Sequence, residues 1–464
     1  MRIVTLVLCA VVSGAVQENR AHSIAFVGAT VVDVSAFGSG TADIRDSVVI
    51  VQNGRITAVG TRRATKIPRD AEVVDTTGKF IVPGLHDVFA TIDNQAYANA
   101  FLYLGVTAIV ANEAPSDRRD ALFMTGTPSP RVYRMATVQG YDAKGLSPAP
   151  RTITELMTRG RRMDPAELTT RVDELAGGGV KVLLLHYSLL PDQLRLVAAH
   201  ARRIGLGTIG ELGATSYPEA ISAGVRAFVH TSRYSLELAS PDLRAKVAAA
   251  PFGPPRIPYY EYLASLKDDD PALARYAATL GASGVMLIPT LSLSYLDLPG
   301  HRNPWTEPVA RLLDPADLNL PADPKTGERP VPANPTRDGF PPGFNEHLQV
   351  IEARYCKAGA RYLAGSGTDA LGTMPGISLH TELELLVKAC LTPRQALAAA
   401  TANVGTAFAW RDVGQIRAGY NADLLVLDAD PTADIANLKR QVQELKAMVV
   451  SMQEALGISP APAG

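Results

Sequence analysis

The chain has 464 residues, of which 47% are hydrophobic and 20% are charged, a balance typical of globular proteins rather than disordered ones. Its formal net charge is −1, so no basic surface is indicated and nucleic acid is excluded as an expected partner. A chain of this length can bury a large core without disulfides or metals to hold it together.

The first fifteen residues have the layout of a secretory signal peptide. Arg2 supplies a positive start, residues 3–12 are almost wholly apolar, and Ser13 to Ala15 are the small residues of a cleavage site. A buried first strand is the alternative, but it explains neither Arg2 nor the small residues. We therefore expect residues 1–15 to be removed and the protein to be secreted or periplasmic. No later stretch reaches the about 18 consecutive apolar residues of a membrane span.

Both ends of the mature chain have β character. Residues 24–83 are predicted to form short strands, with a tight hairpin turn at Asn53-Gly54, because both residues accept a positive φ at little cost. Strand character returns after residue 412, most clearly from Asp423 to Asp428. We expect residues 24–83 and 412–453 to build one small β-sandwich.

Between these ends, residues 84–411 alternate apolar strand-like runs with helical patterns, which indicates a parallel sheet of βα units. Eight candidate strands favour a (β/α)8 barrel of the TIM type over an open sheet. The candidates are the strand after Gly84 and the runs Val106–Ala111, Val132–Val138, Val180–His186, Gly207–Glu211, Ala227–His230, Val285–Leu291 and Arg361–Gly365.

Helices are predicted over Pro165–Ala176, Pro191–Ile204 and Pro393–Thr401, the last with Thr392 as its N-cap. Residues 295–343 break the barrel pattern and are rich in proline. A long irregular segment between two barrel strands favours a lid-like insertion over the functional mouth.

Five short strings follow one another along the chain: Asn53-Gly54-Arg55-Ile56, Gly78–Asp87, Gly105-Val106-Thr107, Gly365–Asp369 and Gly419–Leu424. In their order and spacing they resemble the amidohydrolase superfamily, especially its exported imidazolonepropionase-like and prolidase-like branches. The resemblance covers nearly all of the mature chain. It implies a metal-dependent hydrolase whose ligands lie at the C-terminal ends of barrel strands.

The resemblance also shows where this chain departs from the family. A His-x-His metal pair normally ends the first barrel strand, and Phe89 and Thr91 occupy those positions here. Neither is a good ligand for a divalent ion. His86 has the opposite strand parity and is expected to face away from the barrel axis. Lys181 matches the fourth-strand lysine that the family carbamylates, the alternative being a strand-end lysine that reaches solvent.

Three further positions match by the same resemblance. Glu211 stands where the fifth strand normally ends in histidine, and His230 matches the sixth-strand histidine. Asp369 matches the eighth-strand aspartate, which binds metal and accepts a proton from the attacking water. A core histidine and a turn-capping aspartate are the alternatives for His230 and Asp369. Tyr187 and Gln139 are expected to contact substrate.

Taken together, these residues predict one divalent ion, most simply zinc, on carbamylated Lys181, Glu211 and His230, with Asp369 at the bound water. A site without metal is the alternative. Because Phe89 and Thr91 remove two ligands, a two-metal centre is not expected.

The predicted function is an exported hydrolase that cleaves a C–N bond of an amide, cyclic amide or dipeptide through metal-activated water. Two alternatives remain open at this point. One is a pseudoenzyme that keeps the barrel as a small-molecule binding module, and the other is a hydrolase whose chemistry uses other residues without metal. The expected partner is a small-molecule substrate. Both the oligomeric state and the pairing of Cys356 with Cys390 are left open.

Overall fold

The structure is a computed structural model that describes residues 23–112, 128–249, 256–329, 341 and 343–439. The predicted signal peptide, the last part of the predicted β-sandwich and part of the 295–343 insertion lie outside the described residues. In the part of the chain that is described, no helix is long and apolar enough to cross a membrane.

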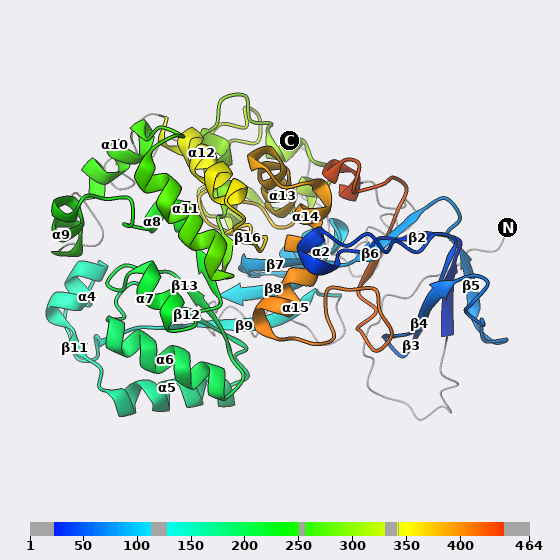
Figure 1. Cartoon of the computed structure of the whole chain (residues 1–464), viewed down its shortest axis with the longest axis horizontal. Helices are drawn as coiled ribbons and strands as arrows, with labels where there is room; N and C mark the ends of the chain where they lie inside the picture. Colours follow the sequence, from blue (N-terminus) through cyan, green and yellow to red (C-terminus); the bar gives the residue numbers. More distant parts are fainter. Residues whose placement is uncertain (1–22, 113–127, 250–255, 330–340, 342, 440–464) are drawn as a thin grey trace.

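Eight parallel strands, paired in sequence order, form the central sheet (Figure 1). They are β7 (Leu85–Ala90), β8 (Val106–Asn112), β9 (Arg131–Val138), β12 (Val182–Leu185), β13 (Gly207–Gly210), β14 (Ala227–Val229), β15 (Met286–Ile288) and β16 (Arg361–Tyr362). The predicted number and direction of the strands are confirmed. The two edges also meet, because Val88 N donates to Ala364 O at 3.0 Å and Gly367 N donates to Phe89 O at 2.8 Å. The result is a barrel-like sheet.

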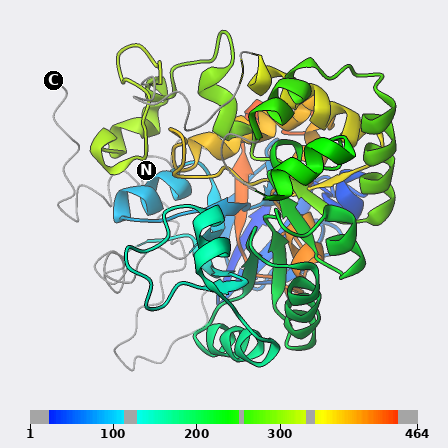
Figure 2. The ribbon, with the colours of Figure 1, turned by 90° about the vertical axis from the view of Figure 1, so that its left-hand side faces the viewer.

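Helices surround this sheet (Figure 2). They are α2 (Gln95–Tyr103), α4 (Ile153–Arg159), α5 (Pro165–Gly177), α6 (Pro191–Arg203), α7 (Tyr217–Ser222), α8 (Thr231–Tyr234), α9 (Pro241–Ala249), α10 (Ile257–Ser265), α11 (Pro271–Ser283), α12 (Phe344–Lys357), α13 (Ile377–Ala389), α14 (Pro393–Ala399) and α15 (Ala402–Phe408). The three helices predicted from sequence are α5, α6 and α14. The Thr392 side chain caps α14 by accepting a hydrogen bond from Gln395 N, as predicted.

Besides a two-stranded pair of β10 (Tyr141–Asp142) and β11 (Arg161–Arg162), two small sheets lie beside the central one, at the right of Figure 1. Their strands are β1 (Ser23–Val27), β2 (Thr30–Val31), β3 (Ser47–Gln52), β4 (Arg55–Thr61), β5 (Glu72–Asp75), β6 (Phe80–Pro83) and β17 (Leu424–Leu427). Asn53 and Gly54 adopt positive φ in the β3–β4 turn. Strand β17 pairs antiparallel with β6, so the two chain ends share one sheet. One apolar cluster joins both small sheets through side chains such as Phe26 and Val426.

The interior of the barrel-like sheet is aliphatic. Val182 and Leu184 of β12 point into it, whereas Leu183 and Leu185 pack outward against the helices. At the N-terminal end of the strands, the interior is covered by α15, where Phe408 packs closely on Gly207. The opposite end of the sheet is therefore the end at which a site can form.

The described part of the 295–343 insertion forms short 3-10 helices, the first of which begins just before it: η2 (Leu291–Asp297), η3 (Pro304–Thr306), η4 (Pro308–Leu312) and η5 (Pro315–Asp317). Trp305 Nε1 donates to Ala322 O at 2.8 Å, which holds the segment to itself. Asn94, the N-cap of α2, donates to Asp317 Oδ2 at 3.0 Å. The segment is thus anchored beside α2, and its role as a lid stays a prediction.

Cys356 and Cys390 form a disulfide with a Cα–Cα distance of 6.1 Å. The bond joins the C-terminal ends of α12 and α13, which are 34 residues apart in sequence. It answers the question that the sequence left open, and it suits the oxidising compartment expected for an exported protein.

Replacing Cys356 and Cys390 together by serine is expected to lower the free energy of unfolding by roughly 3 to 4 kcal/mol, because the closed loop no longer restricts the unfolded chain. Denaturant unfolding of the variant, beside wild type with and without reductant, measures the difference. Equal stability of the oxidised and reduced wild type would contradict the prediction.

Candidate active site

The side chains at the C-terminal ends of the strands come together because parallel strands end at the same edge of the sheet. We call this end the barrel mouth. Glu211 follows β13, His230 follows β14 and Thr290 lies two residues beyond β15. These three strands are adjacent in the sheet, so the three side chains are neighbours although 79 residues separate the first from the last.

Glu211 and His230 face each other at the mouth. Glu211 Oε1 lies 3.6 Å from His230 Nε2, and their side chains are only 12% and 8% exposed. The Tyr187 hydroxyl donates a short hydrogen bond to the same Oε1. The prediction that Tyr187 lies at the site is consistent with this contact, which orients the carboxyl group toward the imidazole.

The hydrogen bonds of Thr290 set the tautomer of His230. Thr290 Oγ1 donates its only proton to Pro289 O at 2.6 Å. The same oxygen lies 2.5 Å from His230 Nδ1, so it accepts a hydrogen bond from Nδ1–H. The lone pair of the ring is then on Nε2, which is the nitrogen that faces Glu211.

Burial shifts the ionisation of this group toward neutral forms. Desolvation raises the pKa of Glu211 to about 7, partly offset by the hydrogen bond from Tyr187. Desolvation, with a smaller contribution from the Arg233 charge, holds the pKa of His230 well below its ordinary value. The imidazole is therefore neutral, and the 3.6 Å approach is not an ion pair.

The backbone is strained where these side chains leave their strands. His230 and Thr290 have φ of 55° and 52°, in the left-handed region that non-glycine residues rarely adopt. Thr290 is β-branched, which makes this conformation costlier still. Strain of this kind persists where the surrounding structure holds a functional arrangement in place, and here it is found at both ends of the His230–Thr290 hydrogen bond.

Phe89 occupies space at the mouth beside His230. The two rings meet edge to face, with centroids 5.4 Å apart and planes at 84°. Gly365 gives Phe89 room, since a Cβ at residue 365 would lie 2.9 Å from the Phe89 Cβ atom. The predicted absence of a ligand at residue 89 therefore has a structural counterpart, because an apolar ring fills that position.

Asp369 belongs to a second group of polar side chains. The Tyr97 hydroxyl lies 2.8 Å from Asp369 Oδ2 and 2.8 Å from Asp317 O, and Thr91 Oγ1 lies 3.4 Å from Asp369 Oδ1. Burial, with a contribution from Asp93, raises the pKa of Asp369. The Tyr97 hydroxyl thus has two acceptors within hydrogen-bond distance, Asp369 Oδ2 and Asp317 O, and it ties the carboxyl group of Asp369 to the segment that contains Asp317.

Lys181 is not at the mouth, and the position inferred for it from sequence is wrong. It is exposed and immediately precedes β12, at the N-terminal end of that strand. His186 follows the C-terminal end of β12, about 16 Å further along at strand spacing, with the inward parity of Val182 and Leu184. Two features of the sequence could have identified His186. It has the same parity as the inward residues Val182 and Leu184, and it directly follows the last residue of the strand.

Two other predicted positions can now be placed. Gln139 directly follows β9, so it lies at the mouth end of the sheet, and its side chain is exposed. His86 is buried, with Nδ1 3.2 Å from Gly84 O, away from the groups described above. The sequence analysis did not identify Thr290, Tyr234 and Tyr97, because only their contacts with residues beyond the strand ends, such as His230 and Asp369, show that they belong to the site.

The three-ligand metal site predicted from sequence is not assembled. Lys181 lies at the other end of the strands, and Asp369 is held by Tyr97 and Thr91. Glu211 and His230 remain as two donors 3.6 Å apart. Over the residues that the structure describes, no three His, Cys, Asp or Glu side chains are grouped as metal ligands. The donor set therefore does not fit a structural or catalytic zinc site with three protein ligands.

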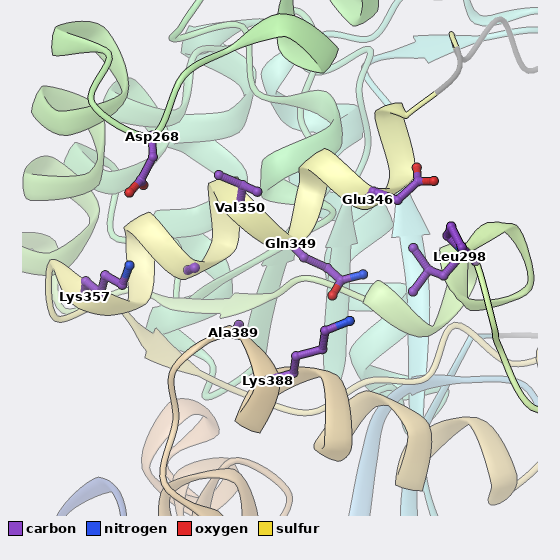
Figure 3. Close-up of a pocket in the computed structure, with 10 residues that line it drawn as sticks. Asp268, Leu298, Glu346, Gln349, Val350, Lys357, Lys388 and Ala389 are labelled. Carbon is purple, nitrogen blue, oxygen red and sulfur yellow. The ribbon is translucent and has the colours of Figure 1, made fainter.

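A groove elsewhere on the surface is separate from the mouth (Figure 3). It runs along α12 and the end of α13, beside the Cys356–Cys390 disulfide, and Lys357, Lys388, Glu346 and Gln349 are among its lining residues. It carries none of the strand-end groups, so it is not the place for the predicted chemistry.

Comparison with known proteins gives the same family as the motifs. A profile of the amidohydrolase family matches residues 273–452. An imidazolonepropionase from Deinococcus deserti is 36% identical over 99 residues, which are 20% of this chain and 25% of that enzyme. The sequence match thus spans a quarter of the enzyme's length.

Solved structures agree over most of the chain. A Xaa-Pro dipeptidase with bound methionine in its active site is 13% identical, with a TM-score of 0.60 over 90% of this chain and 97% of that one. The ochratoxinase of A. niger is 16% identical, with a TM-score of 0.58 over 91% and 93%. A bottromycin amidohydrolase is 18% identical, with a TM-score of 0.61 over 96% and 95%. At these identities the likeness concerns the fold.

Protein purified without chelator is expected to carry at most one tightly bound divalent ion per chain, because Phe89 and Thr91 supply no strong ligand. Lys181→Met should leave the metal content unchanged, since the amine lies at the opposite end of the strands. Elemental analysis of both proteins tests this. Two ions in wild type, or a loss of metal in Lys181→Met, would show that the donor assignment is wrong.

Proposed function

Because this chain belongs to the amidohydrolase superfamily, we propose that it hydrolyses the C–N bond of a small amide, cyclic amide or dipeptide at the barrel mouth. The observation that carries the proposal is the arrangement of Tyr187, Glu211 and His230 at neighbouring strand ends. The names of the relatives, a Xaa-Pro dipeptidase and a bottromycin amidohydrolase, support this class of reaction.

Proton transfer is assigned to Glu211. In its ionised form the carboxylate takes a proton from water while the water oxygen bonds to the carbonyl carbon of the substrate. His230 Nε2, which carries a lone pair, accepts a hydrogen bond from the same water and orients it. The C–N bond then breaks, and the carboxyl group of Glu211 returns the proton to the departing nitrogen. The products are a carboxylic acid and an amine, so atoms and protons balance.

Asp369 was the base predicted from sequence, and Glu211 replaces it in this proposal. Glu211 faces a neutral imidazole that can hold water, whereas the neighbours of Asp369 are Tyr97, Thr91 and the Asp317 carbonyl. A general base must reach the proton it removes, and the Glu211–His230 pair offers a place for that water. Asp369 is assigned a structural role, because its contact with Thr91 links the end of β7 to the segment that follows β16.

Members of this superfamily usually bind metal, and a bound divalent ion would lower the pKa of its water and polarise the carbonyl. Lys181 lies at the opposite end of the strands, which leaves Glu211 and His230 as the two donors at this mouth. No step of the hydrolysis is therefore assigned to a metal. This is the alternative in which the hydrolase uses its own acid and base groups.

A binding module without catalysis is the second candidate. The observation that favours it is Phe89, which fills the position of a ligand and packs against Gly365 and His230. Under this alternative the mouth would bind a small amide and release it unchanged. The experiment that follows separates the two candidates.

Glu211→Gln is expected to lower kcat by about 100-fold or more with little change in KM, because an amide cannot accept the proton while the side-chain shape is kept. Turnover is measured on a panel of dipeptides and N-acyl amino acids by mass spectrometry of the products. Glu261→Gln is the matched control, since Glu261 is exposed on α10.

Asp369→Asn is measured beside these two variants. A loss confined to Asp369→Asn, with Glu211→Gln unaffected, would return the role of base to Asp369. Binding without turnover of any compound in wild type would leave the binding-module candidate standing.

Export is part of the proposal and rests on the apolar stretch that ends in Ser13-Gly14-Ala15. Expression of the full chain in a Gram-negative host is expected to give periplasmic protein that begins near residue 16. N-terminal mass spectrometry of the periplasmic fraction checks it. Intact Met1 on protein confined to the cytoplasm would refute export.

A further inference from the structure

Five rings stand in an unbroken edge-to-face row across the mouth. Phe89 meets His230 at 5.4 Å between centroids, and His230 meets Tyr234 at 5.4 Å. Tyr234 meets Tyr187 at 5.7 Å, and Tyr187 meets His186 at 5.1 Å. The angles between successive planes lie between 70° and 89°. We call these five side chains the aromatic row.

The aromatic row is not simply core packing. Phe89, Tyr187, Tyr234 and His186 are partly exposed, and only His230 counts as buried. Deeper in the sheet, the inward strand positions are aliphatic. The change from aliphatic side chains to partly exposed rings takes place where the strands end, which is where a substrate would approach.

The charges around the row favour an uncharged ligand over a cation. Arg256 is 1% exposed, and its guanidinium carbon lies 5.5 Å from the centre of the Tyr234 ring. Arg233, one residue before Tyr234, is also buried and donates to Ser294 Oγ at 2.5 Å. Against the one carboxyl group that touches the row among the described residues, that of Glu211, these two buried positive charges leave an excess of positive charge, which opposes a further cation on the rings.

We propose that the aromatic row is the subsite for an aromatic acyl group, so that the substrate class is an uncharged aromatic amide of the benzoyl type. The inference rests on the proposed function, because it assigns the acyl side of the same C–N bond. Aromatic rings prefer edge-to-face and offset contacts with one another, and the partly exposed rings of the row, Phe89, Tyr187, Tyr234 and His186, can offer such contacts to an incoming ring.

The row also places the reacting carbonyl. Tyr187 belongs to the row through its ring and to the acid–base group through its hydroxyl, which donates to Glu211 Oε1. His230 is likewise shared, with its ring in the row and Nε2 facing Glu211. An acyl ring against the row therefore brings its carbonyl carbon next to the Glu211–His230 pair, to which the proposed mechanism assigns the attacking water.

The test is calorimetric binding of benzamide and cyclohexanecarboxamide to the full chain. The two amides are similar in size, and only benzamide is aromatic. Benzamide is expected to bind about tenfold more tightly, the effect of one good aromatic contact. Phe89→Leu should reduce that preference to about threefold or less. Phe37→Leu is the matched control, since Phe37 packs against the barrel interior from the covered N-terminal end, and it should keep the tenfold preference. If Phe89→Leu does not fold, Tyr234→Leu takes its place.

Equal affinity for the two amides, no binding of benzamide, or tighter binding of the cation benzamidine would overturn the inference. Hydrolysis of N-methylbenzamide and N-methylacetamide, which are both uncharged, separates the inference from the proposed function. Preference for benzamide with no hydrolysis of either compound keeps the subsite and overturns the hydrolase. Hydrolysis of both compounds at equal rates, with no preference for benzamide, does the reverse.

Discussion

The meeting of parallel strand ends at one edge of the sheet is the constraint on which the site depends. Glu211, His230 and Thr290 come from three successive strands, and none of them contacts another through local sequence. Each strand contributes one or two side chains, and the short strand lengths decide which ones reach the mouth. This placement at adjacent strand ends allows His230 to bond to Thr290 and brings Glu211 close to His230. The strained backbone at His230 and Thr290 is the energetic cost of the arrangement.

The second feature of the mouth is that an apolar ring, that of Phe89, occupies the position of an expected metal ligand. Phe89 needs a neighbour without a side chain, and Gly365 supplies it from the segment that follows β16. The ring then packs edge-on against His230. Burial lowers the pKa of His230, and the Phe89 ring is one of the groups that lie against it. The same side chain thus stands where a ligand would be and packs against the histidine that remains.

The sequence predicted the strands and the family well, but it predicted the position of a single lysine poorly. Apolar runs and turn residues show that a strand exists, and the order of motifs such as Gly365–Asp369 shows which strand it is. The run Val180–His186 turned out to contain a strand of four residues, Val182–Leu185. Lys181 and His186 flank it at opposite ends, and periodicity alone does not say which flank carries the site. Contacts such as Tyr97 with Asp369 join residues 272 positions apart, so no local pattern reports them.

Burial determines how the polar side chains at the mouth, Glu211 and His230, ionise. A carboxyl group in water near neutral pH is an ion and a poor proton donor, whereas burial raises the pKa of Glu211 to about 7, so that both protonation states are available. Tyr187 keeps the carboxyl oriented in either state, and Thr290 keeps the lone pair of His230 turned toward it. The aromatic side chains that exclude water from these groups are the same ones that meet an incoming ring. Desolvation of the acid–base pair and recognition of an apolar acyl group therefore have one structural cause.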